Sequence, residues 1–407
     1  MKLDLVRGLC LLALVCPAFG LDPHKGLTQY SRKVWTQEHG LPQDTIRAIG
    51  QTPDGYLWLG TDEGLARFDG YDFTVFNKDQ NDLPSNSINA LAAGLDGSLW
   101  IGTSAGLTHY STKQFRTYTT KDGLPDDDVI QLFVDHTGLL WIVSGVDLVQ
   151  FDGNKFTVIA AGKDIPLSTI RTVYEDRHHT FWVAGFGGLY KKSGKSFIPV
   201  IDTGTIAAEA INRIVADEHD NLWIGGSSGM IVRYADGRIR EFDTRDGLPD
   251  LFIRAMLLDR DGNLWTGTNN GLARFENNRF VTLVGPSGRY QDQVRTLFED
   301  REGNLWVGDD DGLSRLRDDI FSVYTTGEGL PADDPTAVFQ DHTGRIWLGF
   351  HDAGLVLFSP EKGYKQYTTR DGLPSNEIFS IRENRAGDLM IGTREGLVRG
   401  ISTASGE

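Results

Sequence analysis

The chain has 407 residues, and its hydrophobic share of 40% is enough for a packed core, which excludes an intrinsically disordered protein. Its 56 acidic side chains outnumber 40 basic ones, and this balance disfavours a nucleic-acid partner, because such binding depends on neutralising phosphates. Both cysteines, Cys10 and Cys16, lie near the start, so we expect no disulfide, thiol nucleophile or cysteine metal site in the rest of the chain.

Residues 1–20 have the pattern of a secretory signal peptide. Lys2 and Arg7 give a positive start, residues 8–16 form an apolar run, and the small residue Gly20 stands at the expected cleavage position. The apolar run is too short to span a bilayer. We therefore predict export to the periplasm, with cleavage near Gly20.

Residues 32–401, between a polar lead at 21–31 and a tail at 402–407, contain nine copies of one repeat. Each copy is anchored by a tryptophan, replaced by methionine in the ninth, at spacings of 41 to 43 residues. The anchors are Trp58, Trp100, Trp141, Trp182, Trp223, Trp265, Trp306, Trp347 and Met390. A period in the low forties with several short strands per copy predicts the blades of an all-β propeller.

Each repeat has the elements of a four-stranded blade. In the second repeat these are an innermost strand at 88–93, a strand around Trp100, a third strand at 107–110 and an outer strand at 115–118. An Asp-x-x-Gly turn precedes four of the tryptophan strands, and a Gly-Leu-Pro turn follows most of the outer strands. The tryptophan strands are nearly continuous apolar runs, as expected for strands buried on both faces.

The order of the strands indicates how the ring closes. One outer strand, at 33–37, precedes all nine inner groups, and the last group, at 378–401, has no outer strand after it. This count favours a single nine-bladed propeller whose N-terminal strand completes the last blade and so removes exposed edges. The alternative is a seven-bladed ring followed by the first two blades of a second ring.

One column of the repeat stands out as a candidate ligand site. It lies eleven residues before each anchor, near the start of the innermost strand, where the neighbouring columns are mostly aliphatic. The column reads Arg47, Asn89, Ile130, Arg171, Asn212, Arg254, Arg295, Thr336 and Phe379. We expect its arginines and asparagines to ring the channel mouth, where guanidinium groups suit carboxylate or sulfate. The alternative is that each arginine pairs with an acid of its own or the next blade, for example Arg171 with Glu175 or Asp176.

The glycine turns after the tryptophan strands are expected on the same rim. Phe186 and Phe350 are candidates for stacking on a sugar ring, and His351 for a polar contact; as ordinary turn residues they would have no such role. His178 and His179 lack a third ligand at metal spacing, so we predict no metal site. No nucleophile elbow, zinc-protease or phosphate-loop motif occurs, so we predict no catalytic residue and no cofactor.

Two segments carry a resemblance to a known family. Leu57-Trp-Leu-Gly-Thr-Asp-Glu-Gly-Leu-Ala-Arg-Phe-Asp-Gly70 and residues 99–110 resemble the two-component regulator propeller repeat. The resemblance covers essentially the whole chain after the signal peptide. It implies a periplasmic sensor region of hybrid two-component histidine kinases or related diguanylate cyclases, with polysaccharide fragments as ligands. Family members continue into an immunoglobulin-like domain, a membrane helix and an output domain; this sequence stops at Glu407, which implies a fragment or a separate exported propeller.

These observations predict an exported sensor module that binds an oligosaccharide or other small anionic solute at the channel rim. Its partner would be a membrane-bound kinase or cyclase, or a missing C-terminal output domain. Two other classes stay open: a propeller enzyme, either streptogramin-lyase-like or a glycosidase, and a passive protein-interaction platform. A rim histidine and glutamate within catalytic reach would favour the lyase.

Overall fold

A computed structural model describes residues 20–81, 83–201, 210–227, 230–283, 293–319, 323–326, 329–359 and 363–400. The predicted signal peptide, except Gly20, and the predicted tail lie outside the described residues. The chain divides into two compact units, residues 1–319 and 320–407. In the described part, no helix is long and apolar enough to cross a membrane.

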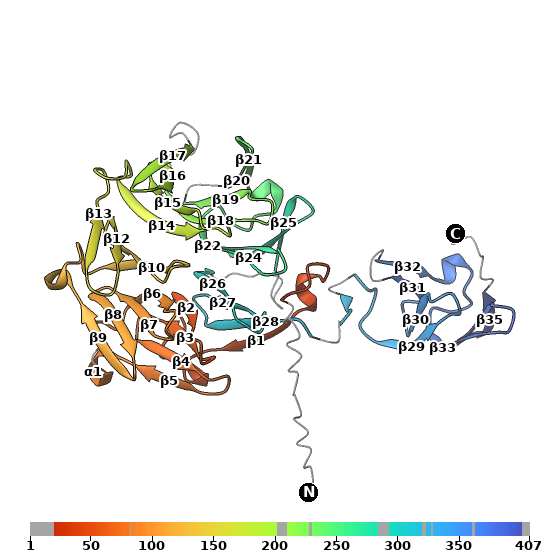
Figure 1. Ribbon diagram of the computed structural model, residues 1–407. Helices are drawn as coiled ribbons and strands as arrows, with labels where there is room; N and C mark the ends of the chain where they lie inside the picture. The colour runs from red at the N-terminus through yellow and green to blue at the C-terminus, as the bar shows by residue number, and fades with distance from the viewer. Residues whose placement is uncertain are drawn as a thin grey trace, which may run out of the picture. The chain divides into compact units, whose positions relative to one another are not determined.

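The described strands of the first unit form seven four-stranded antiparallel sheets (Figure 1). The first three sheets are β2 (Ala48–Gln51), β3 (Leu57–Gly60), β4 (Leu65–Phe68) and β5 (Phe73–Phe76); β6 (Ile88–Ala93), β7 (Leu99–Thr103), β8 (Gly106–Ser111) and β9 (Gln114–Tyr118); and β10 (Val129–Val134), β11 (Leu140–Ser144), β12 (Asp147–Phe151) and β13 (Phe156–Ile159). The next two are β14 (Thr169–Glu175), β15 (Phe181–Phe186), β16 (Gly188–Ser193) and β17 (Ser196–Ile201); and β18 (Ile211–Ala216), β19 (Leu222–Gly226), β20 (Ile231–Ala235) and β21 (Arg238–Phe242).

The last two sheets of the first unit differ in how they are assembled. The sixth consists of the consecutive strands β22 (Ile253–Leu258), β23 (Leu264–Thr268), β24 (Gly271–Glu276) and β25 (Arg279–Thr282). The seventh joins β26 (Thr296–Glu299), β27 (Leu305–Gly308) and β28 (Leu313–Arg317) with β1 (Ser31–Trp35) from the beginning of the chain. The described helices are short: η1 (Leu27–Gln29), η2 (Gln37–His39), α1 (Lys78–Asn81), η3 (Thr120–Asp122), η4 (Thr244–Asp246) and η6 (Thr369–Asp371).

The second unit contains two more sheets of the same kind. They are β29 (Pro335–Gln340), β30 (Ile346–Phe350), β31 (Leu355–Ser359) and β32 (Gly363–Tyr367), followed by β33 (Ile378–Glu383), β34 (Leu389–Thr393) and β35 (Gly396–Gly400). The prediction of an all-β chain with nine propeller repeats, one sheet for each, is therefore confirmed.

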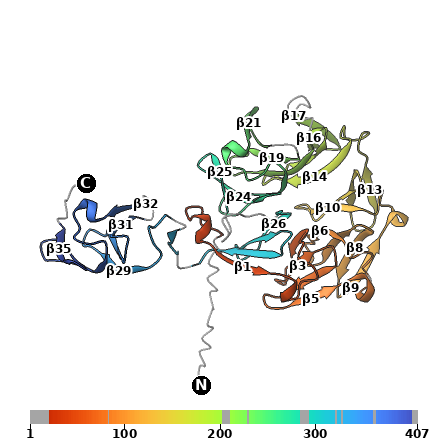
Figure 2. The same ribbon diagram turned by 180° about the vertical axis from the view of Figure 1, so that it is seen from behind.

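The seven sheets of the first unit close into a ring. Each innermost strand contacts the next one along the chain, and β2 of the first sheet contacts β26 of the seventh. In both views the innermost strands face the centre of the ring and the fourth strands lie at its edge (Figures 1 and 2). The expectation that the N-terminal strand completes the ninth repeat is wrong, since β1 pairs with β28, Trp35 opposite Leu313. The alternative, seven blades followed by two more, is the arrangement that the strand pairings give.

A glycine in most of the tryptophan strands explains how neighbouring sheets fit together. A Cβ atom added to Gly60 would lie 2.7 Å from Cγ2 of Ile88, which begins the next sheet. Gly308 of the seventh sheet receives Ile46 of the first in the same way, again at 2.7 Å. The backbone N–H of Ile46 also donates to the carbonyl of Asp309, at 3.0 Å. The same contact that joins consecutive blades therefore closes the ring.

Seven of the tryptophans are each held by a hydrogen bond to the residue six positions earlier. The indole N–H of Trp141 donates to Asp135 at 2.8 Å, and six other tryptophans make the equivalent bond at 2.6 to 2.9 Å. The acceptor is aspartate in every case except Thr52, which accepts from Trp58. The aspartate also accepts backbone N–H groups of its own turn, as Asp135 does from Leu139 at 3.0 Å. One carboxylate therefore fixes both the turn and the blade core.

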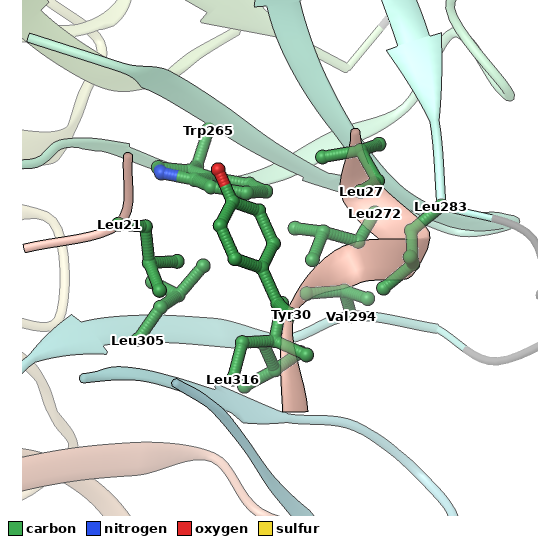
Figure 3. Packing of buried hydrophobic residues seen from close by; sticks show 10 residues of the cluster. Leu21, Leu27, Tyr30, Trp265, Leu272, Leu283, Val294, Leu305 and Leu316 are labelled. Atoms are coloured by element: carbon green, nitrogen blue, oxygen red, sulfur yellow. The ribbon is translucent and has the colours of Figure 1, made fainter. Parts of the chain in front are cut away.

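The segment predicted as a polar lead contributes to the core. Leu21, Leu27 and Tyr30 are buried, with 1%, 6% and 5% of their surface exposed, against Trp265 and other side chains of the sixth and seventh sheets (Figure 3). The fully buried guanidinium of Arg274 donates to Tyr30 Oη at 2.5 Å and to the carbonyl of Lys25 at 2.8 Å. The lead therefore fastens the two sheets at which the ring closes.

Removing the hydroxyl of Tyr30 tests this fastening. The hydroxyl donates to the carbonyl of Asp22 at 2.6 Å and accepts from Arg274, so Tyr30→Phe leaves a buried guanidinium short of one acceptor. We expect urea unfolding to give a free energy of unfolding lower by about 1–3 kcal/mol. Tyr71→Phe, at a side chain that is 88% exposed, is the control and is expected to change nothing. Equal stability of the two variants would contradict the assigned role of the lead.

The aspartate beneath Trp141 predicts a dependence of stability on pH. Burial alone would raise the pKa of Asp135, but hydrogen bonds from Thr137, Trp141 and Leu139 outweigh it and hold that pKa below its usual value. A carboxylate whose pKa is lower in the folded state stabilises the fold above the ordinary Asp pKa of about 3.9 and loses that effect as the pH falls. Asp135→Asn should lower the free energy of unfolding by about 1–3 kcal/mol at pH 7. The difference in free energy of unfolding between Asp135→Asn and the wild type should become smaller at about pH 3. Urea titrations that show the same difference at both pH values would refute this account.

Candidate functional site

The predicted ring column coincides with a backbone irregularity. In five sheets of the first unit the pairing between the innermost strand and its neighbour shifts across the column residue, which forms a β-bulge; for example, Ile253 and Ala255 pair while Arg254 between them is skipped. The same shift occurs at Asn89, Ile130, Arg171 and Asn212. A bulge re-aims the side chain of its extra residue. In these five blades the bulge thus presents one side chain to the channel.

The structure brings the seven column residues of the first unit together around one cavity. The cavity has a volume of about 450 Å³, within the range of small-ligand sites. Its lining consists of Arg47, Asn89, Ser104, Asp128, Ile130, Arg171, Asn212, Arg213, Phe252, Ile253, Arg254 and Arg295. Five of these residues are arginines and one is an acid. That they bind a ligand stays a prediction.

Two of the arginines are neutralised within their own blades. Arg47 Nε lies 2.6 Å from Asp62 Oδ1, and its second nitrogen donates to Asp62 Oδ2 at 3.0 Å. Arg295 forms the equivalent ion pair with Asp310. Both acids belong to the glycine turn fifteen residues after the arginine. For these two blades the alternative of a structural ion pair is therefore realised, although the side chains still line the cavity.

Three arginines of adjacent blades, which we call the arginine trio, have no carboxylate within ion-pair distance among the described residues: Arg171, Arg213 and Arg254. At the turn position that holds Asp62 and Asp310 in other blades, Phe186 lies under the Arg171 guanidinium at 5.4 Å, and Asn269 accepts from Arg254 at 2.5 Å. Glu175 and Asp176, the acids considered for Arg171, instead accept from His136 and Trp182. The blades that carry the trio therefore concentrate positive charge on one side of the cavity.

Burial and mutual repulsion affect the trio directly. Burial, together with the nearby Arg254, lowers the pKa of Arg213 to about 10. Burial and then Arg295 lower the pKa of Arg254, against the opposing influence of Asp310 and Asp250. Both groups remain charged at neutral pH, although burial and the neighbouring arginines disfavour the charged form. A bound anion would relieve that cost.

The uncharged lining residues shape the cavity. The Asn89 side chain donates to Asp128 at 3.0 Å, so the one acid of the lining already has a partner. Asn212 donates to the carbonyl of Ile253 at 3.3 Å, which ties the fifth blade to the sixth. The Phe252 ring lies 4.9 Å from the guanidinium of Arg254. The site therefore combines charge with one aromatic face.

Three predicted site residues do not line this cavity. Phe186 is 39% exposed, and its ring contacts the guanidinium of Arg171. Phe350 is fully buried in the core of the second unit, where it packs in one cluster with Leu330 and Val356. The expectation that it stacks on a sugar ring is therefore wrong. His351, also in the second unit, lies with Nδ1 3.2 Å from Glu377 Oε1.

Arg213, which follows the column residue Asn212, lines the cavity but was not among the predicted site residues. In the other eight repeats this next position holds only alanine, glutamine, threonine or serine, so a single charged residue was a visible departure. Asp128 and Phe252 were missed because they precede the innermost strand, where the Gly-Leu-Pro turn varies most.

The sequence pattern of the family described as "Two component regulator propeller" matches residues 40–63, 247–270 and 291–311, and each segment contains a ring arginine. No curated protein matches the chain. Among solved structures, the extracellular domain assigned to the hybrid two component system BT3049 of B. thetaiotaomicron is similar with a TM-score of 0.72 and 22% identity over 93% of this chain and 54% of that one. That assigned to the one component system BT4673 of the same organism gives 0.57 and 22% over 92% and 53%.

The chain thus spans about half the length of these two structures. Virginiamycin B lyase from Staphylococcus aureus is also similar, with a TM-score of 0.58 and 16% identity over 71% of this chain and 99% of the lyase. Identities of this size show a shared propeller fold.

The charge of Arg213 yields a test of whether the trio is structural. Because the pKa of Arg213 is lower in the fold than its usual value, its protonated form costs stability at neutral pH. Arg213→Met keeps the apolar stem and removes the charge, so in anion-free buffer we expect unchanged stability or a gain of up to about 2 kcal/mol. Arg274→Met, at a guanidinium with an acid partner, should instead lose about 2–4 kcal/mol. Losses of the same size in both variants would assign Arg213 to the fold.

Proposed function

We propose that this chain, which carries the two-component regulator propeller repeat, is the ligand-binding sensor module of a two-component-type signalling system in the periplasm. Its ligand is a small anionic solute, such as an acidic oligosaccharide, bound in the channel cavity. The observation that carries the proposal is the arginine trio, three guanidinium groups of adjacent blades without an acid partner in the described residues.

The chemistry of the cavity supports an anion over a neutral solute. A guanidinium group makes paired hydrogen bonds to carboxylate, sulfate or phosphate, and these are stronger than bonds between neutral groups. Arg171 and Arg254 lie on either side of Arg213 in blade order, so their donors can meet one ligand from three blades. Phe252 offers an apolar face for the body of the ligand. Polar groups at one side and an aromatic ring at another are typical of small-ligand sites.

The lining favours binding over catalysis. Among the described lining residues, Asp128 is the one carboxylate, and it accepts a hydrogen bond from Asn89. Proton transfer requires a group within hydrogen-bond reach of the reacting atom, and a glycosidase requires two carboxyl groups on opposite sides of a bond. The lyase similarity argues for the fold and supplies no such group here. A protein-interaction platform remains the alternative class, distinguished by failure to bind any small solute.

The module would signal by a change in its packing against an output partner, either a membrane-bound kinase or cyclase or a downstream domain. Such a response requires that the ligand bind one arrangement more tightly than another. The extracellular domains that this chain resembles are parts of two component and one component systems, which supports a sensing role.

A thermal-shift series on the protein from Leu21 to Glu407 tests the proposal. Acidic and neutral oligosaccharides of equal length are added to the wild type and to an Arg171→Ala plus Arg254→Ala double variant. An acidic sugar at a hundred times its dissociation constant should stabilise the wild type by about 2.7 kcal/mol and the double variant hardly at all. Neutral sugars should give no shift at all.

Two further variants follow the pattern of the blades. Phe186→Asp gives Arg171 the acid that Arg47 and Arg295 have, and we expect it to weaken anion binding about tenfold while leaving the fold intact. Arg47→Gln, at an arginine already neutralised, should weaken binding less than Arg171→Gln does. If no sugar or other small anion shifts the melting of a well-folded sample, the sensor proposal fails and the interaction platform replaces it.

A further inference from the structure

Three side chains with metal-binding atoms meet at the turns of the third and fourth sheets. They are His136, in the turn between β10 and β11, Glu175, the last residue of β14, and His179, in the turn between β14 and β15. Their ligand atoms all lie within 4.8 Å of one another. Glu175 is four residues from Arg171 on the same strand, which places the cluster about 13 Å from the trio, at the other end of β14.

We propose that His136, Glu175 and His179 bind a divalent transition-metal ion such as zinc, which joins the third sheet to the fourth. Two imidazoles and a carboxylate are a donor set that zinc accepts, with solvent in the fourth position. This goes beyond the anion site at the channel and does not depend on it.

The distances are close to those that such an ion needs. Nδ1 of His136 lies 2.5 Å from Oε1 of Glu175, and Nδ1 of His179 lies 3.8 Å from the same oxygen. Around a tetrahedral ion with bonds of about 2.0–2.2 Å, ligand atoms are about 3.3–3.6 Å apart. The distance from His136 to Glu175 must therefore increase by about an ångström, and the distance from His179 to Glu175 must decrease slightly. The two imidazole rings stack at 3.9 Å, and their exposed side chains leave room for small rotations.

His179 occupies a backbone position that the repeat reserves for glycine. Its φ is 59°, in the left-handed region, and seven of the nine repeats have glycine here with φ between 82° and 93°. A side chain with a Cβ is strained in that region, although His tolerates it better than most. The fourth blade therefore keeps a strained histidine, and its imidazole is directed at Glu175 and His136.

The second unit contains the same pair without the third ligand. His342 contacts Glu383 as His136 contacts Glu175, and in both pairs the backbone N–H of the histidine donates to the carboxylate, at 3.0 and 2.9 Å. The position of His179 is taken by Gly387. A histidine–glutamate contact between blades is therefore a recurring structural device, and only the fourth blade adds the residue that makes it a set of three.

Charge also favours a cation at this place. The side chain of Glu175 is 9% exposed, and among the described residues its ion-pair partners are the two histidines. The equivalent glutamate of the seventh blade, Glu299, has a permanent cation, Arg260, as its partner. A metal ion would supply the positive charge that the fourth blade lacks.

Zinc titration of the chelator-treated full protein by calorimetry tests the site. The wild type should bind one Zn²⁺ ion and melt at a higher temperature with it, while Glu175→Gln and His136→Asn weaken binding at least tenfold. Binding should weaken at acidic pH, because the ion replaces protons on the imidazoles. Cobalt substitution gives a second readout, since the intensity of the visible bands reports a four-coordinate site.

His179→Gly is the decisive variant, because it restores the residue of seven other repeats. It should abolish the zinc effect and yet raise the melting temperature of the metal-free protein, so loss of binding cannot be attributed to misfolding. His178→Asn, one residue away and paired with Asp220, and His342→Asn, in the two-ligand cluster, should bind zinc as the wild type does. Zinc binding that survives His179→Gly or His136→Asn, or that His178→Asn removes, would overturn the proposal.

Discussion

The hydrogen bond from the tryptophan indole to an aspartate six residues earlier, made in six blades, is the constraint on which those blades depend. One carboxylate accepts the indole N–H and the backbone N–H groups of its turn, so the turn, the innermost strand and the tryptophan strand are fixed together. The second blade lacks this hydrogen bond and holds its turn and its tryptophan in other ways. Gly94 stands where the aspartate would be, Asp96 takes over the turn through Ser98, and Trp100 instead stacks on His109 at 4.1 Å.

Both proposed binding sites lie where the sequence departs from the regular repeat. One column residue of each blade in the first unit lines the cavity, but only blades in which the turn residue is not an acid leave their arginine unneutralised. Phe186 and Asn269 matter because Asp62 and Asp310 show what the regular repeat would have there. His179 stands out in the same way against glycine. Because the other blades share one pattern, a residue that departs from it can be interpreted as a specific chemical difference.

The sequence predicted what is periodic and local, and failed where distant parts of the chain decide. The repeat count, the strand order and the column that meets at the cavity all followed from spacing. The partner of β1 did not, because a strand of suitable pattern can pair with any open edge, and the contacts that favour the seventh sheet, such as Ile46 against Gly308 and Tyr30 against Arg274, join distant parts of the chain. Phe350 was misjudged because its turn is directed inward by its neighbours. His136 and Glu175 belong to different repeats, so no local spacing could reveal their contact.

The pairing of β1 with β28 has a consequence for how the molecule forms. The two strands come from opposite ends of the first unit, so the strand that is synthesised first must wait for the one synthesised last. Every other blade is built from consecutive hairpins, which form quickly because their contacts are local. Ring closure brings together two strands separated by nearly the whole unit. The entropy cost of closing this long loop arises in one late step. We therefore expect this closing step to set the rate at which the complete ring forms.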